Sequence, residues 1–296
     1  MAYLSTPSHG KYGNVYISRP NNFIGDGLND LTWGTAWDHT SSEFVEIEIQ
    51  SITGTVDVFK YRVNGGAWTE DQAITGAAQT IVHDLTITFA ATTGHTVGDA
   101  WSNGNFASEA TTVDGSTAQI TDTTKRYLKP DAALTITPTE TVNVISIDYT
   151  TGTIYFDGAP GVTTVDGNNA YIDEDYLQVL GYIENWSLSV NVAIADATYM
   201  QLDWEQKTAG QANGSITIGK FFIAAKTFWE QLGEIVLKND KMLLQLFMNM
   251  PTAQSGTHYL AWGVLSSLGV TTSKSDMVKE NVTLTLNGPI SPVYDA

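Results

Sequence analysis

The densest group of side chains that could hold a metal ion is acidic and lies between residues 166 and 175. Carboxylate and amide oxygens at this density suit a hard cation such as calcium. The spacing does not match the calcium-binding loop of EF-hand proteins, so a solvated turn followed by a strand is the favoured interpretation. No metal or cofactor is predicted. The side chains in question are those of Asp166, Asn168, Asn169, Asp173, Glu174 and Asp175.

Histidine is the next residue type that could bind a metal or transfer a proton. No two histidines have the i, i+4 spacing of a helical metal site, and all are expected in loops or turns. Catalysis or metal binding by any of them is not expected. The five histidines are His9, His39, His83, His95 and His258.

A pair of carboxylates, Asp203 and Glu205, flanks Trp204. Two acids beside an aromatic ring can cleave a glycosidic bond, and on a strand both carboxylates would point the same way. A loop at the edge of an assembly is the favoured interpretation. The sequence contains no cysteine and no Gly-x-Ser-x-Gly or Ser-x-x-Lys motif. No catalytic residue is predicted, and we expect the chain not to be an enzyme.

Four tryptophans fall in the first third of the chain. Exposed tryptophan rings stack on sugars, but buried rings are the commoner use in a small β unit. We expect Trp68 and Trp101 in a core. Trp33 and Trp37 lie in a glycine-rich stretch and keep a sugar-binding alternative open.

The composition favours a folded, acidic protein. Hydrophobic residues make up 42% of the 296 residues, charged residues only 16%, and the net charge is −18. No basic cluster could release counterions from DNA, so tight nucleic-acid binding is not expected. Met1–Gly10 lacks the pattern of a signal peptide, and no apolar run is long enough to span a membrane. We therefore expect synthesis in a cytoplasm and no membrane partner.

The elements that must position these side chains are mostly strands. Period-2 alternation predicts strands at 44–49, 58–63 and 85–89, with a turn at Asn64-Gly65-Gly66 that needs positive φ. Residues 102–120 are polar, show little periodicity and are expected to form a linker. Residues 20–42 are expected to form a long loop that contacts neighbouring copies of the chain.

The remaining residues predict further strands and one helix. Phe221, Phe228 and Leu232 belong to an apolar pattern with helical spacing that ends at Gly233, which predicts an amphipathic helix at about 221–232. The fold class is therefore mainly β, a sandwich or barrel with one flanking helix and a small inserted all-β module. Further strands are expected at 133–138, 144–149, 153–157, 183–192, 215–218, 242–249, 260–268 and 282–287.

From about Gly181 to the C-terminus, a series of motifs in fixed order resembles the tail tube (major tail) proteins of tailed phages. The strand-turn-strand at 147–156 belongs to the same pattern, and residues 44–101 resemble a small β module inserted in phage structural proteins. The motifs are Tyr182–Val190, Ala195–Tyr199, Asp203–Gly210, Phe228–Gly233, Met242–Asn249, Tyr259–Leu268 and Lys274–Ile290.

This resemblance implies a structural virion protein. Six copies would form a ring, and rings would stack into a tube through which the genome passes. Implied partners are other copies of the chain and the tape-measure, terminator and baseplate or tip proteins, assembled in the host cytoplasm. An acidic bore would not hold DNA. The expected segments are an N-terminal arm at 1–43, the inserted module at 44–110 and the tube domain at 111–296. A carbohydrate-binding or capsid-decoration protein is the alternative.

Overall fold

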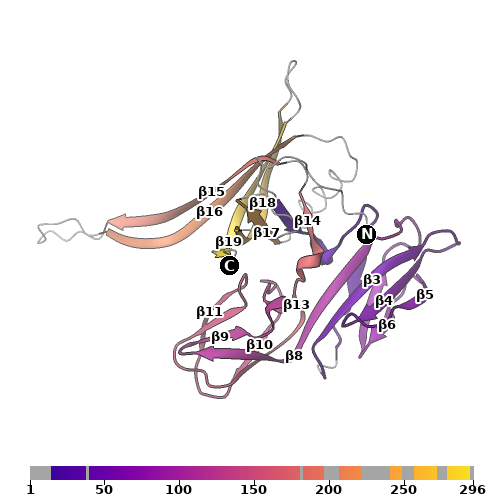
Figure 1. The fold of residues 1–296 in the computed structure, drawn as a ribbon, viewed down its shortest axis with the longest axis horizontal. Helices are drawn as coiled ribbons and strands as arrows, with labels where there is room; N and C mark the ends of the chain where they lie inside the picture. The colour runs from indigo at the N-terminus through magenta and orange to yellow at the C-terminus, as the bar shows by residue number, and fades with distance from the viewer. Residues whose placement is uncertain are drawn as a thin grey trace, which may run out of the picture.

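The computed structural model describes residues 15–37, 40–180, 183–196, 207–221, 241–248, 257–271 and 279–293. It confirms a mainly β fold, in which antiparallel strands form three sheets (Figure 1). In these residues the only helices are short 3-10 turns, and no helix is long and apolar enough to cross a membrane. The 3-10 turns are η1 (Pro20–Asn22), η2 (Thr123–Lys125) and η3 (Glu174–Tyr176).

The predicted flanking helix at 221–232 is not supported. Its first residue, Phe221, ends strand β16 (Lys207–Phe221), where it pairs with Lys279. Backbone pairing with a neighbouring strand therefore overrides the helical spacing at this position. Residues 222–232 lie outside the described residues.

The first sheet has seven strands in the order β14-β1-β17-β18-β19-β16-β15. All six residues of β17 are buried, so this central strand packs on both faces. Leu244 and Leu246 join one core cluster, and Leu243 joins another on the opposite face. The other strands are β14 (Leu177–Val179), β1 (Val15–Ser18), β18 (His258–Thr271), β19 (Lys279–Val293) and β15 (Ile183–Asp196).

The second sheet has nine strands and supports two further cores. Its main path runs β11-β12-β9-β8-β3-β4-β5, while β13 pairs with both β8 and β10. The strands are β11 (Val144–Asp148), β12 (Thr153–Phe156), β9 (Thr117–Ile120), β8 (Ala100–Asp114), β3 (Glu43–Ser51), β4 (Val58–Val63), β5 (Thr69–Ala73), β10 (Thr135–Pro138) and β13 (Thr163–Tyr171).

The third sheet, with the order β2-β7-β6, completes the small β unit. We use this name for strands β2 to β7 and the first half of β8, which surround the core that contains Trp101. The positive φ predicted for the turn after β4 is present at Asn64 and Gly65. The strands of the third sheet are β2 (Leu31–Trp33), β7 (Leu85–Phe89) and β6 (Gln79–Val82).

The expected linker at 102–120 is wrong, because most of it is strand. β8 spans 15 residues and is followed by β9. Its first half pairs with β3 and its later residues with β13 and β9. Ser102, Asn103 and Asn105 are fully buried there. A central strand made of small polar residues shows none of the apolar alternation from which strands are predicted.

The loop expected at 20–42 is interrupted by the turn η1 and by the strand β2, and its contact with neighbouring copies stays a prediction. Phe23 and Leu31 are almost completely buried in the core of the small β unit, and Leu31 pairs with Phe89 through β2. This segment is a structural part of the unit, because it supplies one of its strands. The division of the chain into segments at 43 and 110 stays a prediction.

Candidate functional site

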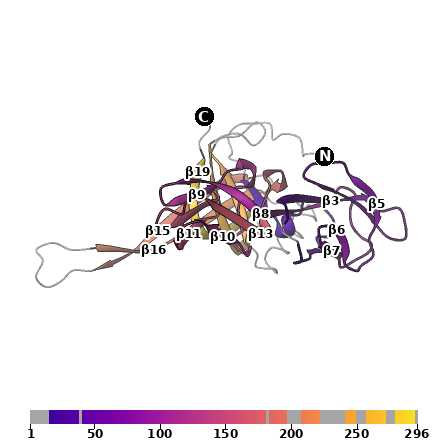
Figure 2. The same ribbon diagram turned by 90° about the horizontal axis from the view of Figure 1, so that it is seen from below.

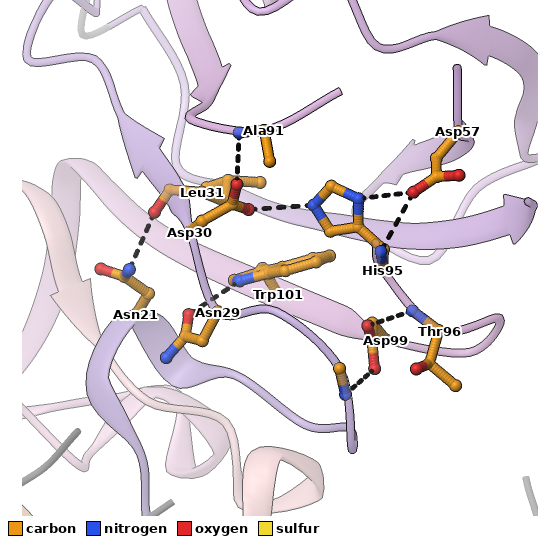
Figure 3. A network of polar contacts seen from close by, with 11 residues as sticks. Asn21, Asn29, Asp30, Leu31, Asp57, Ala91, His95, Thr96, Asp99 and Trp101 are labelled. Atoms are coloured by element: carbon orange, nitrogen blue, oxygen red, sulfur yellow. Dashed lines mark hydrogen bonds and ion pairs between the residues drawn. The ribbon is translucent and has the colours of Figure 1, made fainter. Parts of the chain in front are cut away.

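A buried polar network in the small β unit centres on His95 (Figure 3). Nε2 of His95 lies 2.9 Å from Oδ1 of Asp30, and Nδ1 lies 2.9 Å from Oδ2 of Asp57. Asp30 directly precedes β2, Asp57 directly precedes β4, and His95 lies in the turn before β8. One imidazole therefore connects three parts of the chain.

The charges of this network support one another. Burial acts to lower the pKa of His95, but the hydrogen bonds and charges of Asp30 and Asp57 outweigh burial, so that the pKa is raised. Burial likewise acts to raise the pKa of Asp30, yet its bonds to His95 and to the N–H of Ala91 leave that pKa lowered. The arrangement favours an imidazolium between two carboxylates.

Asp99 forms the second half of the network. Its carboxylate accepts hydrogen bonds from the backbone N–H groups of Asp26 at 3.1 Å, Gly27 at 3.0 Å and Thr96 at 2.7 Å. Burial raises the pKa of Asp99, and these three bonds act in the opposite direction. A β-carbon at Gly27 would lie 2.1 Å from the carboxylate, so the approach of the backbone requires glycine.

The network holds the fold together and has no access to a substrate. The side chain of His95 is 0% exposed and that of Asp57 is 4% exposed. Trp101, also fully buried, donates from Nε1 to Oδ1 of Asn29 at 3.0 Å. These bonds fasten the segment before β2 to β8, so that the chemistry of the network is structural.

The structure disperses the acidic group at 166–175. Asp166 lies on β13 and accepts a bond from the N–H of Ser108, whereas Asp173 accepts one from the N–H of Asp175 at the start of η3. Glu174 bonds the hydroxyl of Tyr127. Across the described ranges, no three His, Asp or Glu side chains are grouped so as to hold a metal ion.

The two asparagines of this acidic group bind other parts of the chain. Nδ2 of Asn168 donates to the carbonyl groups of Gly34 and Thr35, both at 3.3 Å. Oδ1 of Asn169 accepts a bond from Nζ of Lys129 at 3.0 Å. Both asparagines therefore act as structural contacts.

Two other histidines also have structural partners. Nδ1 of His83 lies 2.8 Å from Oε1 of Glu43. Nε2 of His258 lies 3.2 Å from the amide nitrogen of Gln245. His258 begins a strand and is therefore not in a loop or turn as expected. His9, His39 and the Asp203-Trp204-Glu205 group lie outside the described residues.

The burial of the four tryptophans differs from the expectation based on the sequence. Trp101 is in the core as predicted, but Trp68 is only half-buried, with Lys60 and Arg62 each 4.6 Å from its ring centroid. Trp37 is 5% exposed, and Trp33 packs against the same core. The buried ring of Trp37 has no face free to stack on a sugar.

One edge of the seven-stranded sheet is formed by β15. Among the described residues, β15 ends the strand order and pairs with β16 alone. β16 pairs with β19 only from Ser215 to Phe221, so the part of the β15–β16 hairpin beyond this register is a two-stranded ribbon. Figure 2 shows this ribbon extending away from the other strands.

An apolar groove lies where the ribbon leaves the sheet. It measures about 270 Å³ and is lined by residues of β15, β16 and β19, among them Val190, Asn213 and Ile290. Val190 is 52% exposed. The exposed apolar side chain and the free strand edge therefore occur together.

No protein-family model and no curated protein sequence matches the chain. Similar solved structures include a chain in the tail of an empty gene transfer agent particle with C6 symmetry, at 17% identity and a TM-score of 0.34, covering 41% of this chain and 87% of that one. A chain of the native gene transfer agent virion gives 15% identity, a TM-score of 0.34 and coverages of 40% and 91%. A chain in the six-fold symmetrised baseplate of the anti-feeding prophage has 9% identity and a TM-score of 0.30. The match covers 40% of this chain and 84% of that one.

Proposed function

We propose that the chain is a structural subunit of a phage-like tail, and specifically a tail tube subunit that associates with copies of itself into stacked rings. The observation that carries the proposal is the 14-residue edge of β15, with which no second strand of the described residues pairs. An unpaired strand edge presents a row of backbone N–H and C=O groups that can pair with another chain. The motifs from Gly181 onward support the same assignment by resemblance.

The ribbon favours association because it is poorly stabilised alone. A two-stranded hairpin is marginally stable in water, and it gains stability from a third strand or a packed face. From Lys207 to Gly214, β16 pairs with β15 and with no third strand among the described residues. A neighbouring subunit would supply the missing partner.

The remaining edges of the seven-stranded sheet are less suitable. β14, at the opposite end of the sheet, has only three residues. The half of β19 that β16 leaves unpaired contains Pro289 and Pro292, which have no N–H to donate. β15 is therefore the edge best able to accept a strand.

Association through β15 with a different surface of the next copy would be heterologous. Such head-to-tail contacts close into rings when the rotation between subunits permits. Six copies in each ring is the number that the resemblance implies. A net charge of −18 suits a bore that DNA passes without binding. The tape-measure, terminator and baseplate or tip proteins are the proposed partners besides the chain itself.

Sedimentation velocity of the purified chain over a wide concentration range, with negative-stain microscopy of the same samples, tests the proposal. We expect a concentration-dependent shift from the 32.1 kDa monomer to ring-sized species, and rings or tubes on the grid. A chain that stays monomeric at every concentration, alone and with a tail-tip extract as initiator, would contradict self-association.

A further inference from the structure

Several buried polar atoms have no hydrogen-bond partner in the described part of the chain, and six of them lie on five side chains of the small β unit and of the adjoining strand β13. Buried polar groups are almost always bonded to protein or to ordered water, and an unbonded one is costly. The side chain of Asn103 is fully buried with both ends of its amide unbonded. The six atoms are Nδ2 and Oδ1 of Asn103, Nδ2 of Asn105, Oε2 of Glu43, Nε1 of Trp33 and Oδ1 of Asn168.

The strand register brings three of these side chains together. Asn103 and Asn105 are two residues apart on β8 and therefore share one face. Glu43 lies directly opposite Asn105, and Val45 lies opposite Asn103. Val45 belongs to the core of the small β unit, so this face of β8 and β3 points into that core. The three polar side chains form its polar end.

The other two side chains are linked to these three through neighbouring residues. Trp33, the last residue of β2, packs against the core that contains Val45. Asn168 bonds the carbonyl groups of Gly34 and Thr35, which directly follow Trp33. The next residue along, Asn169, donates its N–H to Oδ1 of Asn105 at 2.8 Å. The unbonded atoms therefore come from the second sheet, which includes β13, and from the third sheet.

The balance of donors and acceptors defines the ligand. Three of the atoms are N–H donors (two amide nitrogens and one indole nitrogen), which would repel a cation. The other three are acceptors, including a carboxylate oxygen, which would repel an anion. A small neutral molecule that both donates and accepts fits this set, and a buried water molecule makes about three hydrogen bonds.

We propose that the polar end of the small β unit binds one or more ordered water molecules, held by the amide of Asn103 together with Asn105, Glu43 and Trp33. The water then supplies hydrogen bonds to the buried polar groups of β8 and β3 at this end of the core.

The replacement Asn103→Leu tests the proposal by the sign of its effect on thermal stability. If water bonds the amide, leucine removes that bond and leaves the neighbouring atoms unpaired, so Tm falls. If the amide is dry and unbonded, an apolar group of similar shape relieves the cost, so Tm rises. A Tm of Asn103→Leu at or above that of the original chain would overturn the proposal.

Asn29→Leu is the matched control. Its amide has both partners within the chain, since Nδ2 donates to the carbonyl of Pro20 and Oδ1 accepts from Trp101, each at 3.0 Å. The fall in Tm of Asn29→Leu therefore shows the effect expected when a hydrogen-bonded amide is lost. Should Asn103→Leu fail to fold, a high-resolution crystal structure of the original chain decides. Solvent density within hydrogen-bond distance of both amide atoms of Asn103 is expected, and its absence there would overturn the proposal.

Discussion

Nδ1 of His95 lies 2.9 Å from Oδ2 of Asp57, a residue 38 positions earlier in the chain. The same carboxylate oxygen accepts the backbone N–H of His95 at 3.0 Å. The other ring nitrogen bonds Asp30, so the imidazole connects the segment before β2 with the segment before β4. Phe89 and Trp101 pack edge-on against the ring.

The stability of the small β unit should depend on pH through this contact. The folded pKa of His95 is raised, so its contribution is complete below the unfolded value of about 6.5 and is lost as pH rises through the folded pKa. The pKa of Asp30 is lowered, so its contribution is lost as pH falls below about 3.8. We expect maximal Tm between these values, measured by calorimetry from pH 3 to 9.

His95→Gln should remove the decline on the alkaline side. The groups that face the imidazole are the carboxylates of Asp30, Asp57 and, at longer range, Asp99. An unchanged alkaline slope in the variant would show that another group causes it. The slope is compared rather than the absolute Tm, because the replacement also lowers stability.

Gly104→Ala should destabilise the chain at the junction of two cores. A β-carbon at this position would lie 2.5 Å from the ring of Tyr171, which stacks on Phe106 with centroids 5.0 Å apart. Overpacking of this kind costs about 1–3 kcal/mol. Gly269→Ala is the control, because its nearest neighbour would be 3.9 Å away. Equal free energies of unfolding for the two variants would rule out the predicted clash.

Arg62→Met should cost more than Lys60→Met, although both cations lie over Trp68. Arg62 donates two hydrogen bonds to Glu46, at 2.5 and 2.7 Å, and its loss leaves a largely buried carboxylate without its cation. We expect about 1.5–3 kcal/mol in chemical denaturation. The pair of Lys60 with Glu48, whose carboxylate is more exposed than that of Glu46, should contribute about 0–1 kcal/mol. The reverse order would contradict this account.

Val190→Lys should weaken self-association while leaving the fold intact. Val190 is exposed beside the groove at the base of the ribbon, and a lysine at a strand edge opposes pairing with another chain. Val97→Lys is the control, because Val97 is similarly exposed but lies in the small β unit. We expect the sedimentation shift to be lost only in Val190→Lys, with an unchanged Tm. Loss of association in both variants would contradict the assignment of the association surface to β15.

Strands with apolar alternation could be predicted from the sequence. β4 and β7 have the expected bounds, because alternating Val, Phe, Ile and Leu side chains report directly which face is buried. The positive φ after β4 follows from Asn64-Gly65, which few other residue pairs allow. These features are local, so a short window of sequence contains them.

The remaining features depend on contacts between distant residues. β8 could not be predicted, because Asn103 and Asn105 are buried by strands far away in the sequence. The His95 network could not be predicted for the same reason. Nothing in the sequence around Asp30 or Asp57 indicates that either carboxylate binds this imidazole. The apolar spacing that begins at Phe221 indicated a helix, yet pairing with Lys279 makes its first residue part of a strand.

In the proposed assembly, the edge of β15 joins one subunit to the next around an acidic bore. A cryo-electron microscopy reconstruction of the assembled chain tests it most directly. The account predicts a ring in which the outer edge of β15 pairs with the neighbouring subunit and in which carboxylates outnumber cations along the bore. A ring joined through other strands with β15 in solvent, or a bore lined by lysine and arginine, would contradict it.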